Sequence, residues 1–359
     1  MTSTENTQLG FFDRIKESFK GVLLGLVLIP ISFIVVYNAS QREQASEVLN
    51  KAIPLEEMTK TKEKKLPIYV EGKLKVEPTT DNLYLKPGPY LVISRKTEIY
   101  AYVDKSSTKD NKTTYTCELE WTSSPENSAD GEGCKKENKT NPAKKIQDFY
   151  QSYNPMLIRN DQTFQINGRV RYIDMPTKTV TSSDLTESLL IDGTYFYVKE
   201  SCLKNPEVGC ERFSYNITTY DENKTYTVIG SVDTNVITEY KSKEGNHYLV
   251  IGEGNFQDVL KALGSQDTRG TWFLFGLSVF LFGLGLILLI NPFLELVEMI
   301  PFIGGFGAGM IRFFIFIFAF VIMGISFLLI EYWYVIIILG IIGVISLIVW
   351  GINRSKQKA

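Results

Sequence analysis

The sequence predicts an α+β membrane protein in which four transmembrane helices, one N-terminal and three C-terminal, hold a large β-rich domain outside the membrane. The first observation is a set of four apolar runs, at residues 21–37, 271–290, 304–330 and 333–350. A helix rises about 1.5 Å per residue, so roughly 20 such residues cross the hydrocarbon core of a bilayer. The second is a polar, strand-like region at residues 66–270 between the first two runs. The third is that all four cysteines fall inside this region.

Residues 1–20 form a predicted cytoplasmic lead-in with an amphipathic helix, and the run at residues 21–37 then crosses the membrane. A cleavable signal peptide is the alternative for this run, because it too has a basic start and a short apolar stretch. Its cleavage pattern is incomplete, since Tyr37 lies two residues before Ala39, and a retained anchor is favoured. Pro30 within the run should bend the helix or leave one carbonyl unpaired.

The flanks of the spans set the predicted orientation, because Lys and Arg in short flanks stay on the cytoplasmic side. Three basic residues precede the first span and three lie in the tail at residues 351–359. Both termini should therefore be cytoplasmic, which requires an even number of spans. The β-rich domain then lies on the opposite side. A bacterial cytoplasmic membrane with a periplasmic domain is favoured, and the endoplasmic reticulum or inner nuclear membrane is the alternative.

The extramembrane region begins with a predicted helical linker at residues 38–65. From residue 66 onward, short segments rich in Tyr, Val, Ile and Thr are broken by Pro, Gly and Asn, a pattern typical of β-strands. A weak internal echo relates residues 70–76 to residues 166–172, and residues 91–103 to residues 189–197. Two related β subdomains would explain this echo, and chance similarity among alternating strands explains it equally well.

The cysteines are even in number and confined to one side, which suits an oxidising compartment. Four cysteines permit three pairings, and we favour Cys117 with Cys134 and Cys202 with Cys210 because each pair is close in sequence and separated by turn-forming residues. Four free thiols are the alternative. A metal site is disfavoured, since no spacing is Cys-x-x-Cys and the single histidine, His247, is distant.

The C-terminal membrane region carries three predicted features. Residues 291–303 should form a cytoplasmic interfacial or re-entrant helix that places Glu295 and Glu298 on one turn. The glycines that follow allow close helix packing, either within the chain or between two copies. Charged and aromatic residues at the ends of the spans should anchor them at the membrane interface. The glycines are Gly304, Gly305, Gly307 and Gly309, and the anchors are Arg312, Glu331, Tyr332, Trp333 and Tyr334.

The sequence contains no pattern typical of catalysis. A single histidine removes most nucleophile–base designs, and His247 lies in a polar turn typical of a surface residue. Neither a Gly-x-Ser-x-Gly elbow nor a phosphate-binding Gly-x-x-x-x-Gly-Lys-Ser/Thr loop occurs. The spans hold almost no ionisable residues, which disfavours ion-coupled transport. We therefore expect no enzyme activity, no cofactor and no metal.

Several short patterns follow one another along nearly the whole chain. They are Phe12-Asp-Arg-Ile-Lys-Glu-Ser-Phe-Lys-Gly21, Arg95-Lys-Thr-Glu-Ile-Tyr100, Tyr115-Thr-Cys-Glu-Leu-Glu-Trp121, Asn141-Pro142, Pro206-Glu-Val-Gly209 with Arg212, Thr271-Trp272, and Asn291-Pro-Phe-Leu with Ile300-Pro-Phe-Ile-Gly304. No single pattern is specific. Their order, within a layout of one span before the domain and three after it, resembles the LUMA family, also called the transmembrane protein 43 family. The lead-in is similar to that of bacterial members.

The resemblance implies a multi-span endomembrane protein, which in animals is associated with lamins and emerin. The chain departs from the family pattern at Asn38-Ala-Ser-Gln-Arg42, where Asn-Glu-x-Arg is usual, and at Cys210, where an Asp is common. We expect a non-enzymatic scaffold that organises the membrane or envelope through protein binding. A lipid-binding or lipid-handling protein is the first alternative, and a cryptic membrane enzyme is the second. Expected partners are membrane lipids, other membrane proteins and a second copy of the chain, with no nucleic acid.

Overall fold

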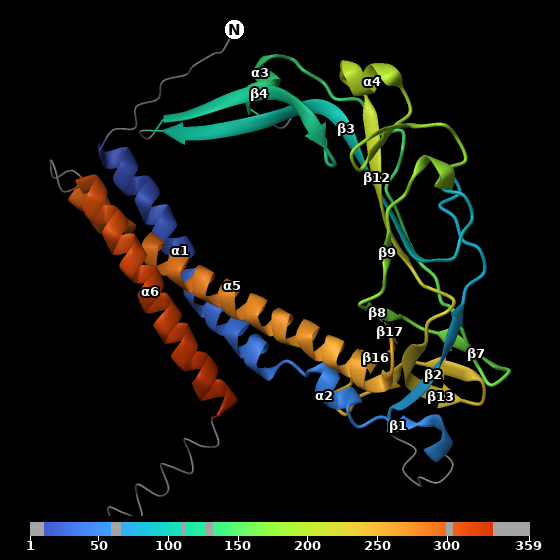
Figure 1. The fold of residues 1–359 in the computed structure, drawn as a ribbon. Coiled ribbons are helices and arrows are strands. Elements are labelled where there is room, and N and C mark those ends of the chain that lie inside the picture. The colour runs from blue at the N-terminus through green and yellow to red at the C-terminus, as the bar shows by residue number, and fades with distance from the viewer. Residues whose placement is uncertain (1–10, 59–65, 110–111, 126–131, 299–303, 333–359) are drawn as a thin grey trace, which may run out of the picture. The chain divides into compact units, whose positions relative to one another are not determined.

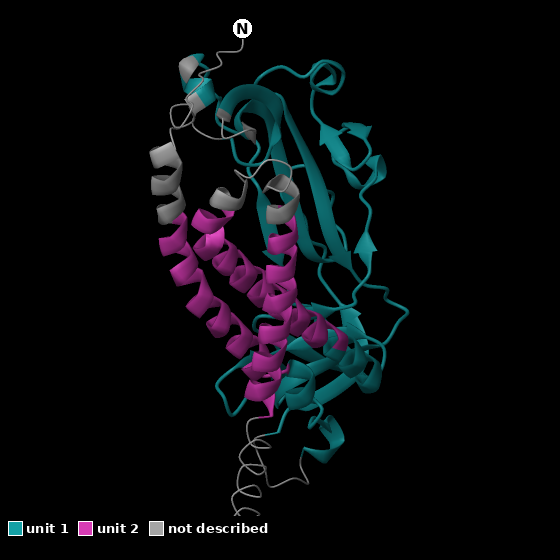
Figure 2. Cartoon of the chain, turned by 90° about the vertical axis from the view of Figure 1, so that its left-hand side faces the viewer, with its two compact units in different colours: residues 1–8, 45–264 teal, residues 9–44, 265–359 magenta. Residues whose placement is uncertain are grey.

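The computed structural model describes residues 11–58, 66–109, 112–125, 132–298 and 304–332. The chain divides into two compact units, which Figure 2 shows in different colours. The β unit comprises the described part of residues 45–264. The helical unit comprises the described parts of residues 9–44 and 265–359.

The helical unit is built on three long helices (Figure 1): α1 (Phe11–Gln41), α5 (Phe256–Glu298), whose first residues belong to the β unit, and α6 (Gly304–Glu331). Each contains a stretch that is long and apolar enough to cross a membrane. The predicted spans at residues 21–37, 271–290 and 304–330 lie on these helices and are confirmed in this respect. The predicted fourth span, at residues 333–350, lies outside the described residues.

Helix α5 is longer than the predicted span at both ends. It begins at Phe256, so residues 256–270, which the sequence pattern assigned to the strand region, are helical. Phe256, Val259 and Leu263 are spaced to share one helix face and are buried in a core of the β unit. At the other end, α5 continues through Pro292 to Glu298, so the predicted break before a separate helix at residues 291–303 is absent over residues 291–298. A proline removes a single backbone donor, and membrane helices tolerate this.

Two serine hydroxyls in the spans bond to carbonyl oxygens of their own helices. Helix α1 runs through Pro30 without a break. The Ser32 hydroxyl donates to the carbonyl oxygen of Ile29 at 2.6 Å, and the Ser278 hydroxyl donates to that of Phe275 at 2.7 Å. A hydrocarbon environment offers these groups no other partner, so local bonding makes the serines compatible with a span.

Helices α1 and α5 cross at a pair of glycines. A Cβ atom added to Gly25 would lie 2.6 Å from the carbonyl oxygen of Gly285, and one added to Gly285 would lie 3.0 Å from the side chain of Ile29. Two residues earlier on α5, a Cβ atom added to Gly283 would lie 2.7 Å from the ring of Phe316 on α6. Close backbone approach of α1 and α5 at Gly25, and room for the side chains of Ile29 and Phe316 at Gly285 and Gly283, therefore set the helix packing at this level.

The first sheet of the β unit has eight strands in the order β1-β2-β6-β7-β14-β13-β17-β8. Strand β2 also pairs with β13, so β2, β6, β7, β14 and β13 close into a ring. Their buried apolar side chains form one cluster that includes Val70, Leu157, Phe164, Val228 and Ile237. The strands are β1 (Ile53–Pro54), β2 (Ile68–Lys75), β6 (Met156–Arg159), β7 (Gln162–Asn167), β8 (Arg171–Ile173), β13 (Tyr226–Asp233), β14 (Val236–Thr238) and β17 (Val250–Glu253).

The second sheet has seven strands, with the order β10-β11-β12-β3-β4, β5 beside β3 and β9 beside β12. The first half of the long strand β3 pairs with β12, and its second half continues with β4 as a two-stranded ribbon. The strands are β3 (Tyr90–Lys109), β4 (Lys112–Thr122), β5 (Phe149–Ser152), β9 (Thr177–Lys178), β10 (Leu190–Asp192), β11 (Tyr195–Tyr197) and β12 (Glu211–Thr219). The remaining elements are α2 (Ala45–Leu49), η1 (Leu55–Glu57), α3 (Glu132–Lys136), η2 (Ser182–Asp184), α4 (Glu200–Lys204), β15 (Tyr240–Lys241) and β16 (His247–Tyr248).

The two sheets are assembled from segments that alternate along the chain. The echoing residues 70–76 and 166–172 both fall in or beside strands of the first sheet, whereas residues 91–103 and 189–197 both fall in or beside strands of the second. The echo therefore relates segments of the same sheet, and the sheets are not two successive subdomains. The predicted large β-rich domain is confirmed.

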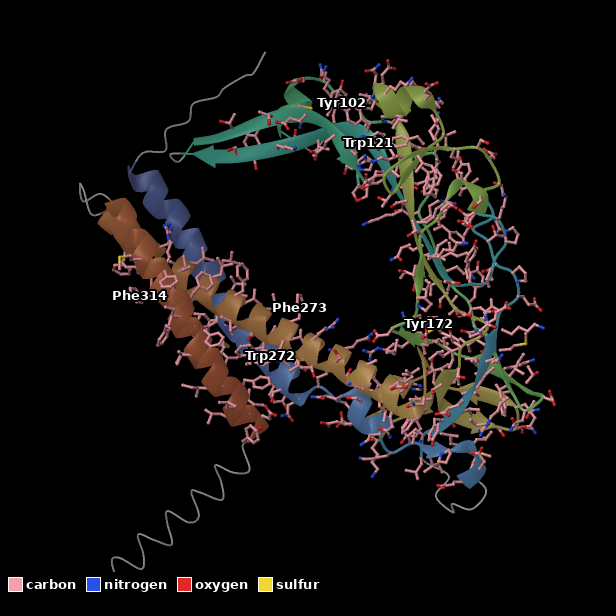
Figure 3. The ribbon with its side chains drawn as sticks, viewed as in Figure 1. Tyr102, Trp121, Tyr172, Trp272, Phe273 and Phe314 are labelled. Carbon is pink, nitrogen blue, oxygen red and sulfur yellow. A yellow bond between two sulfur atoms is a disulfide. The ribbon has the colours of Figure 1, made fainter. Side chains whose placement is uncertain are left out.

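Tyrosine hydroxyls link segments near the junction of the two sheets. The Tyr220 hydroxyl accepts a hydrogen bond from the backbone N–H of Val76 at 3.0 Å, and the Tyr172 hydroxyl donates to the carbonyl oxygen of Tyr153 at 2.5 Å. Burial raises the pKa of Tyr172, so its phenol keeps the proton that it donates. Figure 3 labels Tyr172 in this region.

Candidate binding site

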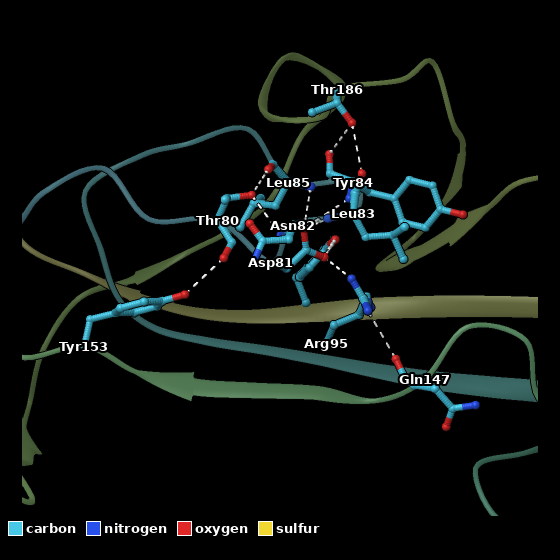
Figure 4. A network of polar contacts seen from close by, with 11 residues as sticks. Thr80, Asp81, Asn82, Leu83, Tyr84, Leu85, Arg95, Gln147, Tyr153 and Thr186 are labelled. Atoms are coloured by element: carbon cyan, nitrogen blue, oxygen red, sulfur yellow. Dashed lines mark hydrogen bonds and ion pairs between the residues drawn. The ribbon is translucent and has the colours of Figure 1, made fainter.

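A buried carboxylate fixes the loop that leads into the second sheet (Figure 4). Asp81 is 4% exposed, and its Oδ2 atom accepts a hydrogen bond from the Tyr215 hydroxyl at 2.6 Å and pairs with the Arg95 guanidinium. Arg95 also donates to the carbonyl oxygen of Gln147 at 3.2 Å. The Oδ1 atom accepts the backbone N–H groups of Leu83, Tyr84 and Leu85, at 3.0, 3.1 and 2.9 Å.

The protonation states of this network follow from its contacts. Burial raises the pKa of the Asp81 carboxyl, but hydrogen bonds from Tyr215 and the loop backbone, together with the charge of Arg95, outweigh burial and hold the pKa below its usual value. Burial and the hydrogen bond to Asp81 raise the pKa of Tyr215. Asp81 is therefore charged and Tyr215 neutral at physiological pH. Because both carboxylate oxygens are occupied and shielded from solvent, the network serves structure rather than ligand binding.

A second charged pair, more exposed than the first, lies on strands β3 and β12. The Arg212 Nε atom donates to Glu98 Oε2 at 2.8 Å, and Arg212 Nη2 lies 2.7 Å from the same oxygen. The guanidinium carbon is 3.7 Å from the ring centroid of Tyr195 and 4.5 Å from that of Trp121. A planar guanidinium can stack on both rings while it bonds to the carboxylate, which a lysine cannot reproduce.

Residues from distant sequence patterns meet around this pair. The Tyr100 and Trp121 rings lie 5.4 Å apart. The N–H of Tyr100 donates to the carbonyl oxygen of Cys210 at 2.8 Å, and the N–H of Gly209 donates to the carbonyl oxygen of Tyr100 at 2.9 Å. Gly209 has a φ of +90°, which favours glycine, and a Cβ atom there would lie 3.1 Å from Pro142. Residues 95–100, 115–121 and 206–212, which carry three of the short sequence patterns, therefore lie next to one another in the folded chain.

Two disulfides staple this end of the second sheet. Cys117 on β4 is bonded to Cys134 on α3, and Cys202 on α4 is bonded to Cys210, which is the predicted pairing. The Asp104 carboxylate lies close to the first pair and accepts two backbone N–H groups of α3, at 3.1 and 2.6 Å. The two sulfurs are bonded to each other and the Asp104 oxygens accept hydrogen bonds. These three residues therefore attach α3 to the β3–β4 ribbon, and their ligand atoms are not free to bind a metal ion. Figure 3 labels Tyr102 and Trp121 on the ribbon.

An open cleft of about 500 Å³ lies beside the stapled pair Cys202–Cys210. One wall is formed by the segment that begins at Pro142. The preceding residue, Asn141, fixes this segment through two side-chain hydrogen bonds with the backbone of Tyr102, at 2.8 and 2.7 Å. The Glu211 carboxylate accepts backbone N–H groups in the same wall. A preformed cleft that mixes aliphatic, backbone and charged groups suits a short polypeptide segment. The lining includes Pro142, Ile146, Val198, Lys199, Glu207 and Glu211.

The structure places His247 away from this cluster. Its side chain is 54% exposed, and its Nδ1 atom lies 3.1 Å from Glu239 Oε2. The predicted surface position is therefore confirmed. An exposed histidine beside one carboxylate has neither a nucleophile nor a substrate pocket among its described contacts, so nothing in its surroundings assigns it a chemical role.

The predicted membrane residues are distributed along α5 and α6. Glu295 and Glu298 lie on the end of α5, and Gly304, Gly305 and Gly307 lie on the first turns of α6. A Cβ atom added to Gly309 meets no described atom within 4 Å, so this glycine is not a point of close packing within the described chain. Arg312 lies near the start of α6, and Glu331 and Tyr332 lie at its end. Trp333 and Tyr334 lie outside the described residues.

Sequence reasoning missed two features that the structure brings out. The Gly25–Gly285 crossing had a signal, because Gly21-x-x-x-Gly25 is a small-xxx-small pattern on the first span. The Asp81 network had none, because its side-chain partners Arg95 and Tyr215 are 14 and 134 residues away along the chain.

Comparison with known proteins agrees with this picture. The family model described as Transmembrane protein 43 matches residues 94–336, which include the Glu98–Arg212 pair, the rings around it and helices α5 and α6 but not α1. Transmembrane protein 43 of Rattus norvegicus is 23% identical over 326 residues, covering 83% of this chain and 80% of that protein. No solved structure matches the chain. The resemblance drawn from the short patterns is confirmed, and the chain belongs to the transmembrane protein 43 family.

Proposed function

We propose that this membrane protein is a non-enzymatic scaffold: its β unit binds a partner polypeptide at the cleft beside the Cys202–Cys210 disulfide, and its helical unit fixes the complex in the membrane. The single observation that carries this proposal is the meeting of three separate sequence patterns at one stapled end of the second sheet, next to an open cleft. A cluster with a purely structural role would not require a cleft of about 500 Å³ beside it.

Rigidity supports a binding role. Ordering a flexible loop on association typically costs about 0.5–1.5 kcal/mol for each immobilised side chain, so a preformed site binds more tightly than a loose one. The cleft wall is held by the Cys202–Cys210 disulfide and by the backbone bonds that join Tyr100 to Gly209 and Cys210. The Arg212 guanidinium, fixed between two rings, holds the strand beneath it.

The two disulfides and the basic flanks of the spans support a β unit outside the cytosol, in a periplasm or lumen. In that compartment the scaffold would meet extracytoplasmic segments of other membrane proteins or a second copy of the chain. Both kinds of partner offer short polypeptide segments of the size that the cleft suits.

The first alternative, lipid handling by the β unit, requires an elongated apolar interior. The cleft beside Cys210 includes Lys199, Glu207 and Glu211 in its lining, which favours a polypeptide over an acyl chain. The second alternative, a cryptic enzyme, requires converging free acids and bases. The titratable groups around Asp81 and Glu98 are instead engaged with one another.

Photocrosslinking from the cleft tests the proposal. A photoreactive amino acid replaces Val198, which lines the cleft and is 46% exposed, in the full chain within its own membrane. The matched control carries the same amino acid at Asn223, in an exposed turn beside the first sheet. We expect a discrete protein adduct from Val198 and none from Asn223. The Cys202→Ser, Cys210→Ser double variant should lose the adduct because the cleft wall is no longer fixed.

Mass spectrometry identifies the adduct. A single recurring polypeptide, whether another membrane protein or a second copy of this chain, supports the proposal. Identical adducts from both positions, or lipid adducts alone, contradict it.

A further inference from the structure

The helical unit contains a pocket of about 470 Å³ between α5 and α6. Its walls are apolar and largely aromatic. Phe275 lies at the centre, with ring centroids of Trp272, Phe320 and Phe327 at 5.7, 5.8 and 5.7 Å from its own. Gly324 also lines the pocket, and a Cβ atom added there would meet nothing within 4 Å. The pocket therefore has an apolar wall with open space that an acyl chain can fill.

One rim of this pocket is polar. Gln44, Thr268, Thr271 and Glu331 line it together with Trp272. Helices α1 and α6 end at this rim and α5 enters the helical unit there, so the rim marks one membrane face of the helical unit. A pocket that is apolar along its length and polar at a membrane face suits a molecule with an apolar chain and a polar head.

The charge of the rim narrows the choice of amphiphile. Glu331 is exposed, and among the described residues its carboxylate has no ion-pair partner. Trp272 is 65% exposed beside it and offers the ring that best attracts a cation. A carboxylate and an indole ring together recognise an ammonium group, whereas an anionic headgroup would be repelled by the carboxylate.

The apolar run that follows Glu331 in the sequence does not supply a positive charge. Residues 333–350 contain no basic residue, and the first one after Glu331 is Arg354. Among the described residues no Lys or Arg lies within ion-pair distance of Glu331, so its carboxylate can accept a cation from another molecule.

We propose that this pocket binds a glycerophospholipid with a primary ammonium headgroup. The ammonium group sits at Glu331 over the Trp272 ring, and one acyl chain lies along Phe275, Phe320 and Phe327. The scaffold thereby selects its lipid neighbours through the helical unit, separately from the polypeptide that its β unit is proposed to bind.

Lipid retention by the full chain tests this proposal. The protein, purified in mild detergent, is incubated with phosphatidylethanolamine or with phosphatidylglycerol of identical acyl chains, and retained lipid is counted by native mass spectrometry. We expect about tenfold stronger retention of phosphatidylethanolamine, because only its ammonium group can donate a charge-assisted hydrogen bond to Glu331. Glu331→Gln should bring the two lipids to within about twofold of each other. Glu244→Gln, an exposed acid in the β unit, should leave the preference unchanged.

A second variant tests the acyl site. Gly324→Leu fills open space without a clash, so the protein should fold and lose retention of both lipids. An equal affinity of the parent chain for the two lipids, or a preference that survives Glu331→Gln, overturns the proposal. So does full retention by Gly324→Leu. Efficient disulfide formation between Gly324→Cys and Ile338→Cys also overturns it, because the chain itself would then fill the pocket.

Discussion

Replacement of Asp81 by asparagine should reduce the free energy of unfolding of the β unit by about 3–5 kcal/mol, the usual result of removing one member of a buried ion pair. The Asp81 side chain is 0% exposed and that of Arg95 is 6% exposed. Asparagine keeps the size of the side chain and some of its hydrogen bonds. It leaves the Arg95 guanidinium buried without a counter-charge, and this desolvated charge is the source of the effect.

Chemical denaturation of the full chain in mild detergent, followed by near-ultraviolet circular dichroism, measures this change. The matched control is Lys105→Met, which breaks an exposed pair with Glu118 and Glu120 on the same sheet, where the Lys105 side chain is 45% exposed. Exposed pairs contribute little, so the control should unfold almost as the parent does. A loss for Asp81→Asn no larger than that for Lys105→Met would refute the argument.

The acid limb of stability gives a second measure of the same network. The pKa of Asp81 is lowered in the folded chain, so its contribution is present above the ordinary carboxyl pKa of about 3.9 and is lost as pH falls through the folded value. The parent chain should therefore lose stability on acidification through this range. Asp81→Asn should show a shallower loss, because it has no carboxyl to protonate at this position. An equal loss of unfolding free energy on acidification in the parent and in Asp81→Asn would contradict the assignment of a charged Asp81.

Three further perturbations test other parts of the structure. Gly25→Leu should lower the stability of the helical unit by about 1–3 kcal/mol through overpacking against Gly285, whereas Gly309→Leu, which meets open space, should not; helical circular dichroism during thermal unfolding compares them. Arg212→Lys should cost about 1–2 kcal/mol, because lysine cannot stack on both rings or place two nitrogens on Glu98 Oε2. The exposed Arg169→Lys should cause no change, and differential scanning fluorimetry compares the two. Cys117→Ser with Cys134→Ser removes a cross-link across 17 residues, worth about 3 kcal/mol in the chain-entropy model, and should speed proteolysis in the β3–β4 ribbon; unchanged cleavage would contradict the staple.

Local patterns predicted the parts of this protein that depend on local chemistry. Apolar runs located three membrane helices, alternation located the β-rich region, and short separation identified Cys117–Cys134 and Cys202–Cys210. The start of α5 was missed because the apolar face of residues 256–263 is short and polar residues separate it from the membrane run.

Long-range pairing explains what the sequence could not predict. The ring of strands closes where Ile68 pairs opposite Gly230 and Tyr226 opposite Gly72, and no pattern near either strand specifies a register over such a separation. The same holds for the cleft beside Cys210, since its walls come from segments around Pro142 and Val198 that meet only in the folded chain. The short family patterns did name residues of the site, Glu98, Trp121 and Arg212 among them, without showing that they touch.

The side of the membrane on which the β unit lies decides whether the scaffold, its disulfides and its partners belong to an extracytoplasmic compartment. A single reporter cysteine at Asn223, in an exposed turn, measures this directly, because the four native cysteines are bonded to one another. We predict that an impermeant maleimide labels Asn223→Cys on intact cells or right-side-out vesicles, and that it labels Lys356→Cys only after the membrane is opened. Labelling of Asn223→Cys solely in inverted vesicles would contradict the proposed orientation and the function built on it.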